Sequence, residues 1–103
     1  SPSFVSFFEN RILNIHPSIL PLFKGLDTHQ RVLDSGMALH GATVHIVSKK
    51  LDSGRILGQT KDPILRGDTK DTLAERLLIK EHKLYPIILK RFLNGNLQPI
   101  LID

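Results

Sequence analysis

The segment 11–25, RILNIHPSILPLFKG, constrains the fold of this 103-residue chain more than any other. Its apolar first part predicts a strand over 11–16, which Pro17 ends, and the prolines after it predict a loop. Side chains two apart in a strand point to the same side of a sheet, so Asn14 and His16 should share one face. An amide and an imidazole are therefore expected side by side where a strand ends.

The rest of the chain alternates between helical and strand-like patterns. Helices are expected over 4–10, 28–35 and 69–94, and strands over 37–47, 55–61 and 98–102. The two strands on either side of the 48–54 turn should pair antiparallel. This alternation predicts an α/β fold, but three or four strands make an incomplete sheet, since α/β sheets normally have both faces covered.

The segment 69–94 is the longest expected element. Leucines, an isoleucine and a phenylalanine recur in it at spacings of three, four and seven, which is typical of an amphipathic helix. Thr72 and Glu75 are three apart and match a capping box, while Asp68 and Thr69 are alternative caps.

Composition excludes several classes of function. The chain has no cysteine, so thiolate and disulfide chemistry are out, and we expect a cytoplasmic location. No apolar run reaches the roughly 18 residues of a membrane span. The net charge of +4 comes from scattered basic residues, which does not favour nucleic acid as a partner. His40 and His45 are five apart on one strand and do not share a face, so no metal site is expected there.

Three residues are candidates for chemistry. His16 can donate or accept a proton near neutral pH, and the Asn14 amide can stabilise a developing oxyanion. Asp52, in an Asp-Ser-Gly turn, would favour the imidazolium form of His16 if the two met. A structural alternative stays open for each: a bond from His16 to a loop carbonyl, pairing of Asn14 with the backbone, and stabilisation of the turn by Asp52.

Several short motifs resemble, in order, the C-terminal half of the phosphoribosylglycinamide formyltransferases, a family of the formyltransferase superfamily. The similarity covers nearly the whole chain. It is carried by NIHPSILP from Asn14, FKGL from Phe23, TH from Thr28, HG from His40, TVH from Thr43, LDSG from Leu51 and EHKLYP from Glu81.

The resemblance implies a formyltransferase-type, Rossmann-like fold of three layers with a mixed sheet. It also implies an enzyme of purine biosynthesis that moves a formyl group from 10-formyltetrahydrofolate, without a metal, to the amino group of glycinamide ribonucleotide. His16 would be the general acid and base, and Asn14 would stabilise the oxyanion. Asp52 would keep His16 charged and help proton transfer through water.

Further roles follow from the same resemblance. Asn14 and Pro17 would also line the substrate site, and Glu81 would contact the ribonucleotide sugar. The loop that borders the folate would consist of Ser48, Lys49, Lys50, Leu51 and Asp52. Thr43 and His45 would lie behind the residues that touch substrate.

The resemblance also implies that residues 1–103 form a single C-terminal segment. The N-terminal half, with its Gly-rich phosphate loop, would be absent, so we expect the isolated chain to be inactive. Its partners would be the ribonucleotide, the folate, and either the missing half or a second copy in a homodimer.

Two alternatives remain. A formyltetrahydrofolate deformylase would use water in place of the amine, although that family typically has a second histidine where Pro17 stands. A non-catalytic assembly module, such as a domain-swapped oligomer formed through an exposed sheet edge, belongs to a different class.

Overall fold

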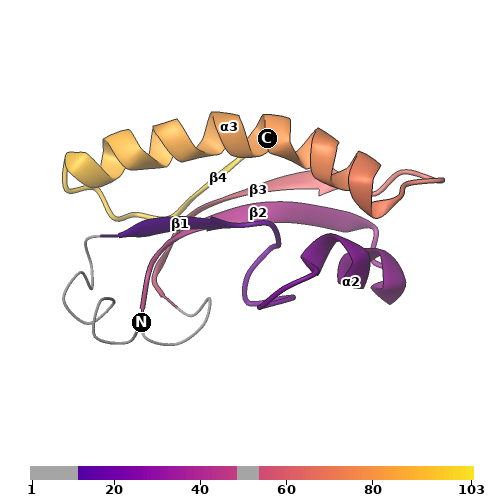
Figure 1. Cartoon of the computed structure of the whole chain (residues 1–103). Helices are drawn as coiled ribbons and strands as arrows, with labels where there is room; N and C mark the ends of the chain where they lie inside the picture. Colours follow the sequence, from indigo (N-terminus) through magenta and orange to yellow (C-terminus); the bar gives the residue numbers. More distant parts are fainter. Residues whose placement is uncertain (1–11, 49–53) are drawn as a thin grey trace.

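The computed structural model describes residues 12–48 and 54–103. Within them the chain is α/β, with one long helix over a four-stranded sheet (Figure 1). The elements are β1 (Leu13–His16), α2 (Thr28–Ser35), β2 (Leu39–Ile46), β3 (Ile56–Pro63), α3 (Lys70–Leu93) and β4 (Ile100–Ile102). The expected helix over 4–10 lies outside the described residues.

The strands follow one another in the order β1-β2-β3-β4. β1 pairs antiparallel with β2, β2 pairs antiparallel with β3, and β4 runs parallel to β3. This confirms the expected antiparallel pair, the short final strand and the mixed sheet. Within the described residues, β1 and β4 are the two edge strands of the sheet.

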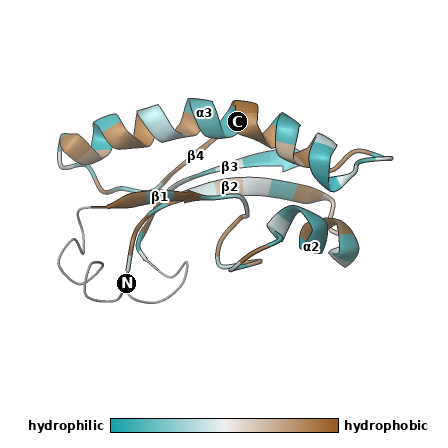
Figure 2. Ribbon diagram, in the orientation of Figure 1, coloured by the Kyte–Doolittle hydropathy of each residue, from teal (hydrophilic) through white to brown (hydrophobic). Residues whose placement is uncertain are grey.

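The core lies between the sheet and α3. Alternate residues of β2, among them Val44 and Ile46, face the helix and pack with Leu57 from β3 and with Leu84 and Ile88 from α3. Figure 2 shows apolar residues on both the helix and the sheet strands that it covers. The prediction of an apolar β2 face that looks at a core is confirmed.

The close approach of α3 requires a glycine on β3. A Cβ built on Gly58 would come within 2.4 Å of the Ile88 side chain, well inside van der Waals contact. Any other residue at 58 would therefore force the Ile88 side chain, or the helix that carries it, to shift.

The N-terminal cap of α3 is one of the two alternatives that the sequence offered, and the expected capping box of Thr72 and Glu75 is not formed. The capping box is formed by Thr69 and Thr72: the Thr69 hydroxyl accepts from the Thr72 N–H, and the Thr72 hydroxyl accepts from the Thr69 N–H. The Thr72–Glu75 pairing was wrong because Thr72 is already in the first helical turn. The alternative cap, Thr69, is confirmed.

The loop after β1 lies on the opposite side of the sheet and completes the three layers, together with α2, which sits near one end of β2 and contacts the start of α3 (Figure 1). α2 begins and ends where the sequence predicted, and Gly36 closes it in a left-handed conformation, at φ 75°. None of the helices in the described ranges combines the length and apolar character that crossing a membrane requires.

Candidate active site

Asn14 and His16 lie on one face of the sheet with two residues of the neighbouring strand. The register pairs Asn14 with His45 and His16 with Thr43, and residues directly opposite in an antiparallel pair share a face. We call this surface, made of Asn14, His16, Thr43 and His45, the polar face. It is the side of the sheet away from α3, so the predicted placement of the amide beside the imidazole is confirmed.

The two candidates differ in exposure. His16 is buried, with 6% of its surface accessible, while Asn14 is exposed. Among the described residues nothing accepts or donates a hydrogen bond to the Asn14 side chain, so the alternative of backbone pairing is not observed there. The amide is therefore open to a ligand on the polar face.

The imidazole of His16 is oriented by the loop that follows it. Its Nε2 lies 2.8 Å from the carbonyl oxygen of Phe23. A carbonyl only accepts, so Nε2 must carry a proton. The bond to a loop carbonyl is the structural alternative that the sequence left open. It also fixes the tautomer of the neutral ring and its direction, as a proton-transferring histidine needs.

The loop itself is bonded to the polar face. The Thr43 hydroxyl donates to the Ser18 carbonyl at 2.8 Å and accepts from the Leu20 N–H at 3.1 Å. Gln59, from β3, donates through Nε2 to Thr43 Oγ1 and to the Leu20 carbonyl. Thr43 thus lies directly behind the loop, while its place behind residues that touch substrate stays a prediction.

Sequence reasoning missed Phe23 and Gln59. Phe23 contributes a backbone atom, which leaves no trace in its residue type. Gln59 lies in an expected strand. It could have been found only by extending the alternation of side chains from β2 to β3 with the correct register, which pairs Gln59 with Thr43.

Part of the predicted site lies outside the described residues. Lys49, Lys50, Leu51 and Asp52 all fall there, so the pairing of Asp52 with His16 stays a prediction. Pro17 directly follows β1 and Ser48 lies two residues after β2, and both are partly exposed.

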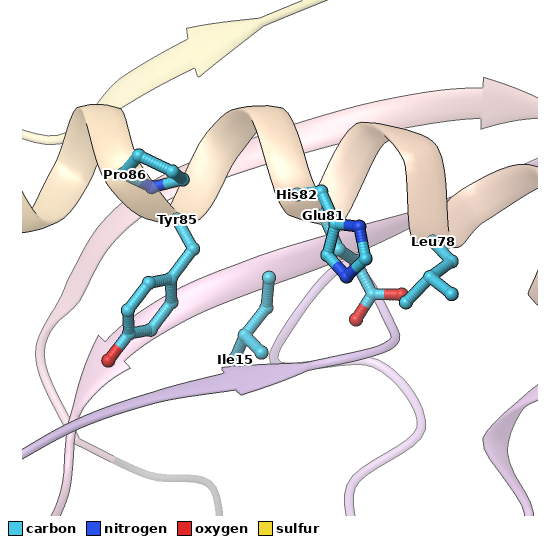
Figure 3. A pocket seen from close by; sticks show the side chains of 6 residues that line it. All are labelled: Ile15, Leu78, Glu81, His82, Tyr85 and Pro86. Atoms are coloured by element: carbon cyan, nitrogen blue, oxygen red, sulfur yellow. The ribbon is translucent and has the colours of Figure 1, made fainter.

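Glu81 lies in a groove on the other side of β1. The groove, of about 300 Å³, runs between this edge strand and α3 (Figure 3). It is lined by Ile15, Leu78, Glu81, His82, Tyr85 and Pro86. Ile15 points away from His16, so the described chain does not bring Glu81 to the polar face. Burial raises the pKa of the Glu81 carboxyl, and His82 partly opposes this.

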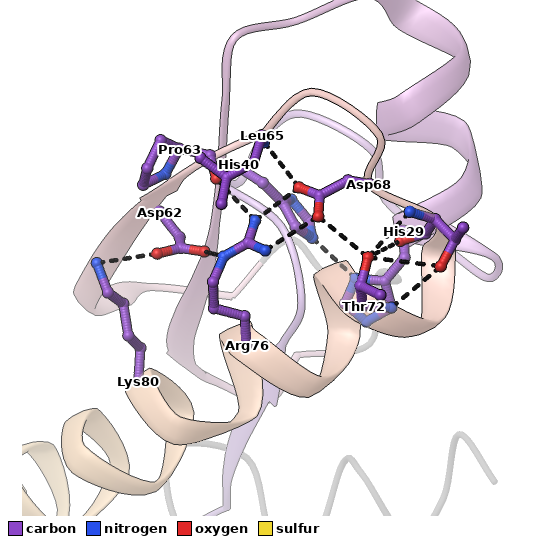
Figure 4. A network of polar contacts seen from close by, with 10 residues as sticks. His29, His40, Asp62, Pro63, Leu65, Asp68, Thr72, Arg76 and Lys80 are labelled. Atoms are coloured by element: carbon purple, nitrogen blue, oxygen red, sulfur yellow. Dashed lines mark hydrogen bonds and ion pairs between the residues drawn. The ribbon is translucent and has the colours of Figure 1, made fainter.

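A second polar cluster lies where α2 meets α3 (Figure 4). His29 Nδ1 and His40 Nε2 are 2.9 Å apart, and His40 is 1% exposed. Arg76 bonds both Asp62 and Asp68 at 2.7 Å. The bond to Arg76 is also the main reason that the pKa of Asp68 lies below its usual range.

The histidine pair predicts that acid destabilises the protein. Burial is the main cause that lowers the pKa of His40 from 6.5 to about 4. The positive charges of His29, Arg76 and His16 lower this pKa further, whereas the negative charge of Asp62 raises it. Burial also lowers the pKa of His29, and the charge of His16 lowers it further. Between pH 6.5 and 4 the unfolded chain therefore binds more protons than the folded one, so the free energy of unfolding decreases as the pH is lowered.

The expected loss from His40 alone is about 3 kcal/mol, complete near pH 4 and absent above pH 6.5. Urea unfolding at pH 7, 5.5 and 4 measures it, and His40→Gln should flatten the dependence. His82→Gln, at an exposed position on α3, is the matched control: it should keep the loss that His40 causes, since its only expected effect is on the pKa of Glu81. An equal slope in wild type and His40→Gln would contradict the assignment.

No cluster of three or more histidine, cysteine, aspartate or glutamate residues that could hold a metal ion occurs within 12–48 and 54–103.

Comparison with known proteins places the chain in a family. The model of the family described as formyl transferase matches residues 1–89. The chain belongs to the formyl transferase family. The resemblance to phosphoribosylglycinamide formyltransferases is confirmed by relatives that bear that name.

The phosphoribosylglycinamide formyltransferase of Escherichia coli (strain K12) is 43% identical over 98 residues, which cover 95% of this chain and 46% of that protein. The trifunctional purine biosynthetic protein adenosine-3 of Homo sapiens is also 43% identical, over 95% of this chain and 10% of that protein. The crystal structure of phosphoribosylglycinamide formyltransferase from Brucella melitensis is 58% identical, with a TM-score of 0.82 over 89% of this chain and 47% of that one.

The formyltransferase fold is therefore established for the described residues. The chain spans about half the length of the Escherichia coli relative and of the Brucella structure.

Proposed function

We propose that the chain supplies the proton-transferring part of an enzyme that moves a formyl group from 10-formyltetrahydrofolate to the amino group of glycinamide ribonucleotide. The observation that carries this is the exposed Asn14 amide beside an imidazole held by the Phe23 carbonyl. An amide donor and an oriented proton carrier are what acyl transfer to an amine requires.

Asn14 would act on the oxygen. When the amine nitrogen attacks the formyl carbon, the carbonyl electrons move to the oxygen, and the Asn14 N–H donates to the resulting anion. The tetrahedral centre then collapses, and the bond between the formyl carbon and N10 of the folate breaks.

His16 would move the protons. The attacking amine must lose one and N10 must gain one, so the net change is a proton passed from amine to N10. Because Nε2–H is engaged by Phe23, this exchange would run through Nδ1. Asp52, together with water, would stabilise the charged ring and complete the path.

The remaining parts of the site would be divided between this chain and an N-terminal half. Glu81, in its groove beside β1, would contact the ribonucleotide sugar, while Pro17 and the loop from Ser48 to Leu51 would border the substrates. The phosphate loop would come from this N-terminal half, which would dock along the open edge of β1. We propose a cytoplasmic location for the assembled enzyme.

The experiment uses a completed protein, in which the N-terminal segment of the Escherichia coli relative precedes this chain. With 10-formyltetrahydrofolate and glycinamide ribonucleotide together, we expect tetrahydrofolate and formylated ribonucleotide in equal amounts. With the folate alone, we expect no formate. Formate release at the same rate without the amine would overturn the transferase proposal in favour of a deformylase.

The names of the relatives described above support the transferase over the deformylase, since these are phosphoribosylglycinamide formyltransferases or a trifunctional purine biosynthetic protein.

A further inference from the structure

Three residues form one row across the polar face. The register pairs His16 of β1 with Thr43 of β2, and Thr43 with Gln59 of β3. Because residues directly opposite in antiparallel strands share a face, Gln59 lies level with His16 two strands away. No role for Gln59 follows from the formyl transfer chemistry itself.

The middle residue of the row uses its full bonding capacity. A threonine hydroxyl has one hydrogen to donate and two lone pairs to accept with. Thr43 Oγ1 donates to the Ser18 carbonyl, and accepts from the Leu20 N–H and from Gln59 Nε2 at 3.0 Å. Thr43 is fully buried, so no water competes for these bonds.

Gln59 is held in one orientation by the same pattern. Its Nε2 donates one hydrogen to the Leu20 carbonyl at 2.9 Å and the other to Thr43 Oγ1. The Leu20 carbonyl only accepts, and the Thr43 hydrogen is already used on Ser18. A flipped amide would therefore place Oε1 against an acceptor, so only the observed orientation satisfies every group.

The loop carries this anchoring to the imidazole. Ser18 and Leu20 are bonded to the row, and the Ser18 hydroxyl donates to the Leu22 carbonyl at 2.5 Å. The next carbonyl, that of Phe23, is the one that accepts from His16 Nε2. The Phe23 carbonyl, which accepts from the His16 ring, is thus held in place by bonds that begin at Gln59.

We infer that Gln59 is a positioning residue, which holds the loop 18–22 on the sheet and so keeps the Phe23 carbonyl against His16 Nε2. The inference rests on the proposed function for its catalytic consequence alone. The state of the imidazole is a separate observable that needs no turnover.

The test is nitrogen NMR of the histidine ring in the 103-residue chain. Wild type should show His16 in the Nε2–H tautomer when neutral. Gln59→Leu keeps a similar volume but removes both donors, and we expect a mixture of the two tautomers. Thr43→Ser keeps the hydroxyl and should retain the wild-type tautomer, whereas Thr43→Val should behave like Gln59→Leu. If Gln59→Leu does not fold, Gln59→Asn, one methylene too short to reach both acceptors, takes its place.

The matched control is Gln98→Leu, the same substitution at an exposed position ahead of β4, and it should leave the His16 ring unchanged. A folded Gln59 variant in which His16 stays in the Nε2–H tautomer would overturn the inference. In the completed protein, the same variant should lower kcat about tenfold or more with little change in KM. A shifted tautomer with an unchanged kcat would leave the positioning role intact and contradict the catalytic role of His16 instead.

Discussion

Replacement of His16 by alanine in the completed protein is expected to lower the rate of formyl transfer about 10²–10⁴-fold, the usual contribution of a positioned acid and base. The ring is buried and bonded to a carbonyl, so it is ordered before substrate arrives. Its removal takes away the proton carrier without touching the exposed Asn14 amide. The loss should therefore fall on kcat, with KM for both substrates nearly unchanged.

Initial rates with saturating substrates measure this loss, and a cooperative urea unfolding transition would show that the variant is folded. Asp52→Ala is the companion variant, because the proposed role of Asp52 is to stabilise the charged His16 ring. It should also lower kcat severely. A near-native rate in either variant would contradict the proposed trio of Asn14, His16 and Asp52.

Much of the fold could be predicted from the sequence because local patterns determine it. Period-two alternation placed Asn14 and His16 on one face and the apolar residues of β2 on the other. The helical stripe over 69–94 and the glycine after α2 set the limits of the helices. Each of these signals extends over a few neighbouring residues, so no knowledge of the register was needed.

The bonds that organise the site could not be predicted in the same way. The Gln59–Leu20 bond joins residues 39 positions apart, and it depends on the register of three strands. The His29–His40 contact depends on how α2 meets the end of β2. The carbonyl of Phe23 is a backbone atom, which any residue type would supply.

Glu81 illustrates a different limit. The resemblance put it in the substrate site, yet the described chain places it across β1 from His16. An edge strand lies between the two, and β1 has no partner on its open side among the described residues. A ribonucleotide that reached both Asn14 and Glu81 would have to pass this edge, which is where an N-terminal half would dock.

The isolated chain is expected to have no formyl transfer activity above background, whereas the completed protein is expected to be active. The polar face offers an amide donor and a proton carrier, but the sequence contains no Gly-rich motif of the kind that holds a phosphate. Binding energy from such remote contacts is what holds the amine in position for attack, and its loss lowers the rate as well as affinity.

If the open edge of β1 instead formed a domain-swapped oligomer, the chain alone would self-associate. Light scattering separates this case, since a monomeric chain counts against the swap.

The most direct test of the whole account is the initial rate of ribonucleotide-dependent formyl transfer by the 103-residue chain, the completed protein and its His16→Ala variant under one set of conditions. We predict no measurable rate for the chain, a clear rate for the completed protein, and a rate lower by about 10²–10⁴-fold for the variant. Robust turnover by the 103-residue chain alone would contradict the claim that it holds only half of the active site.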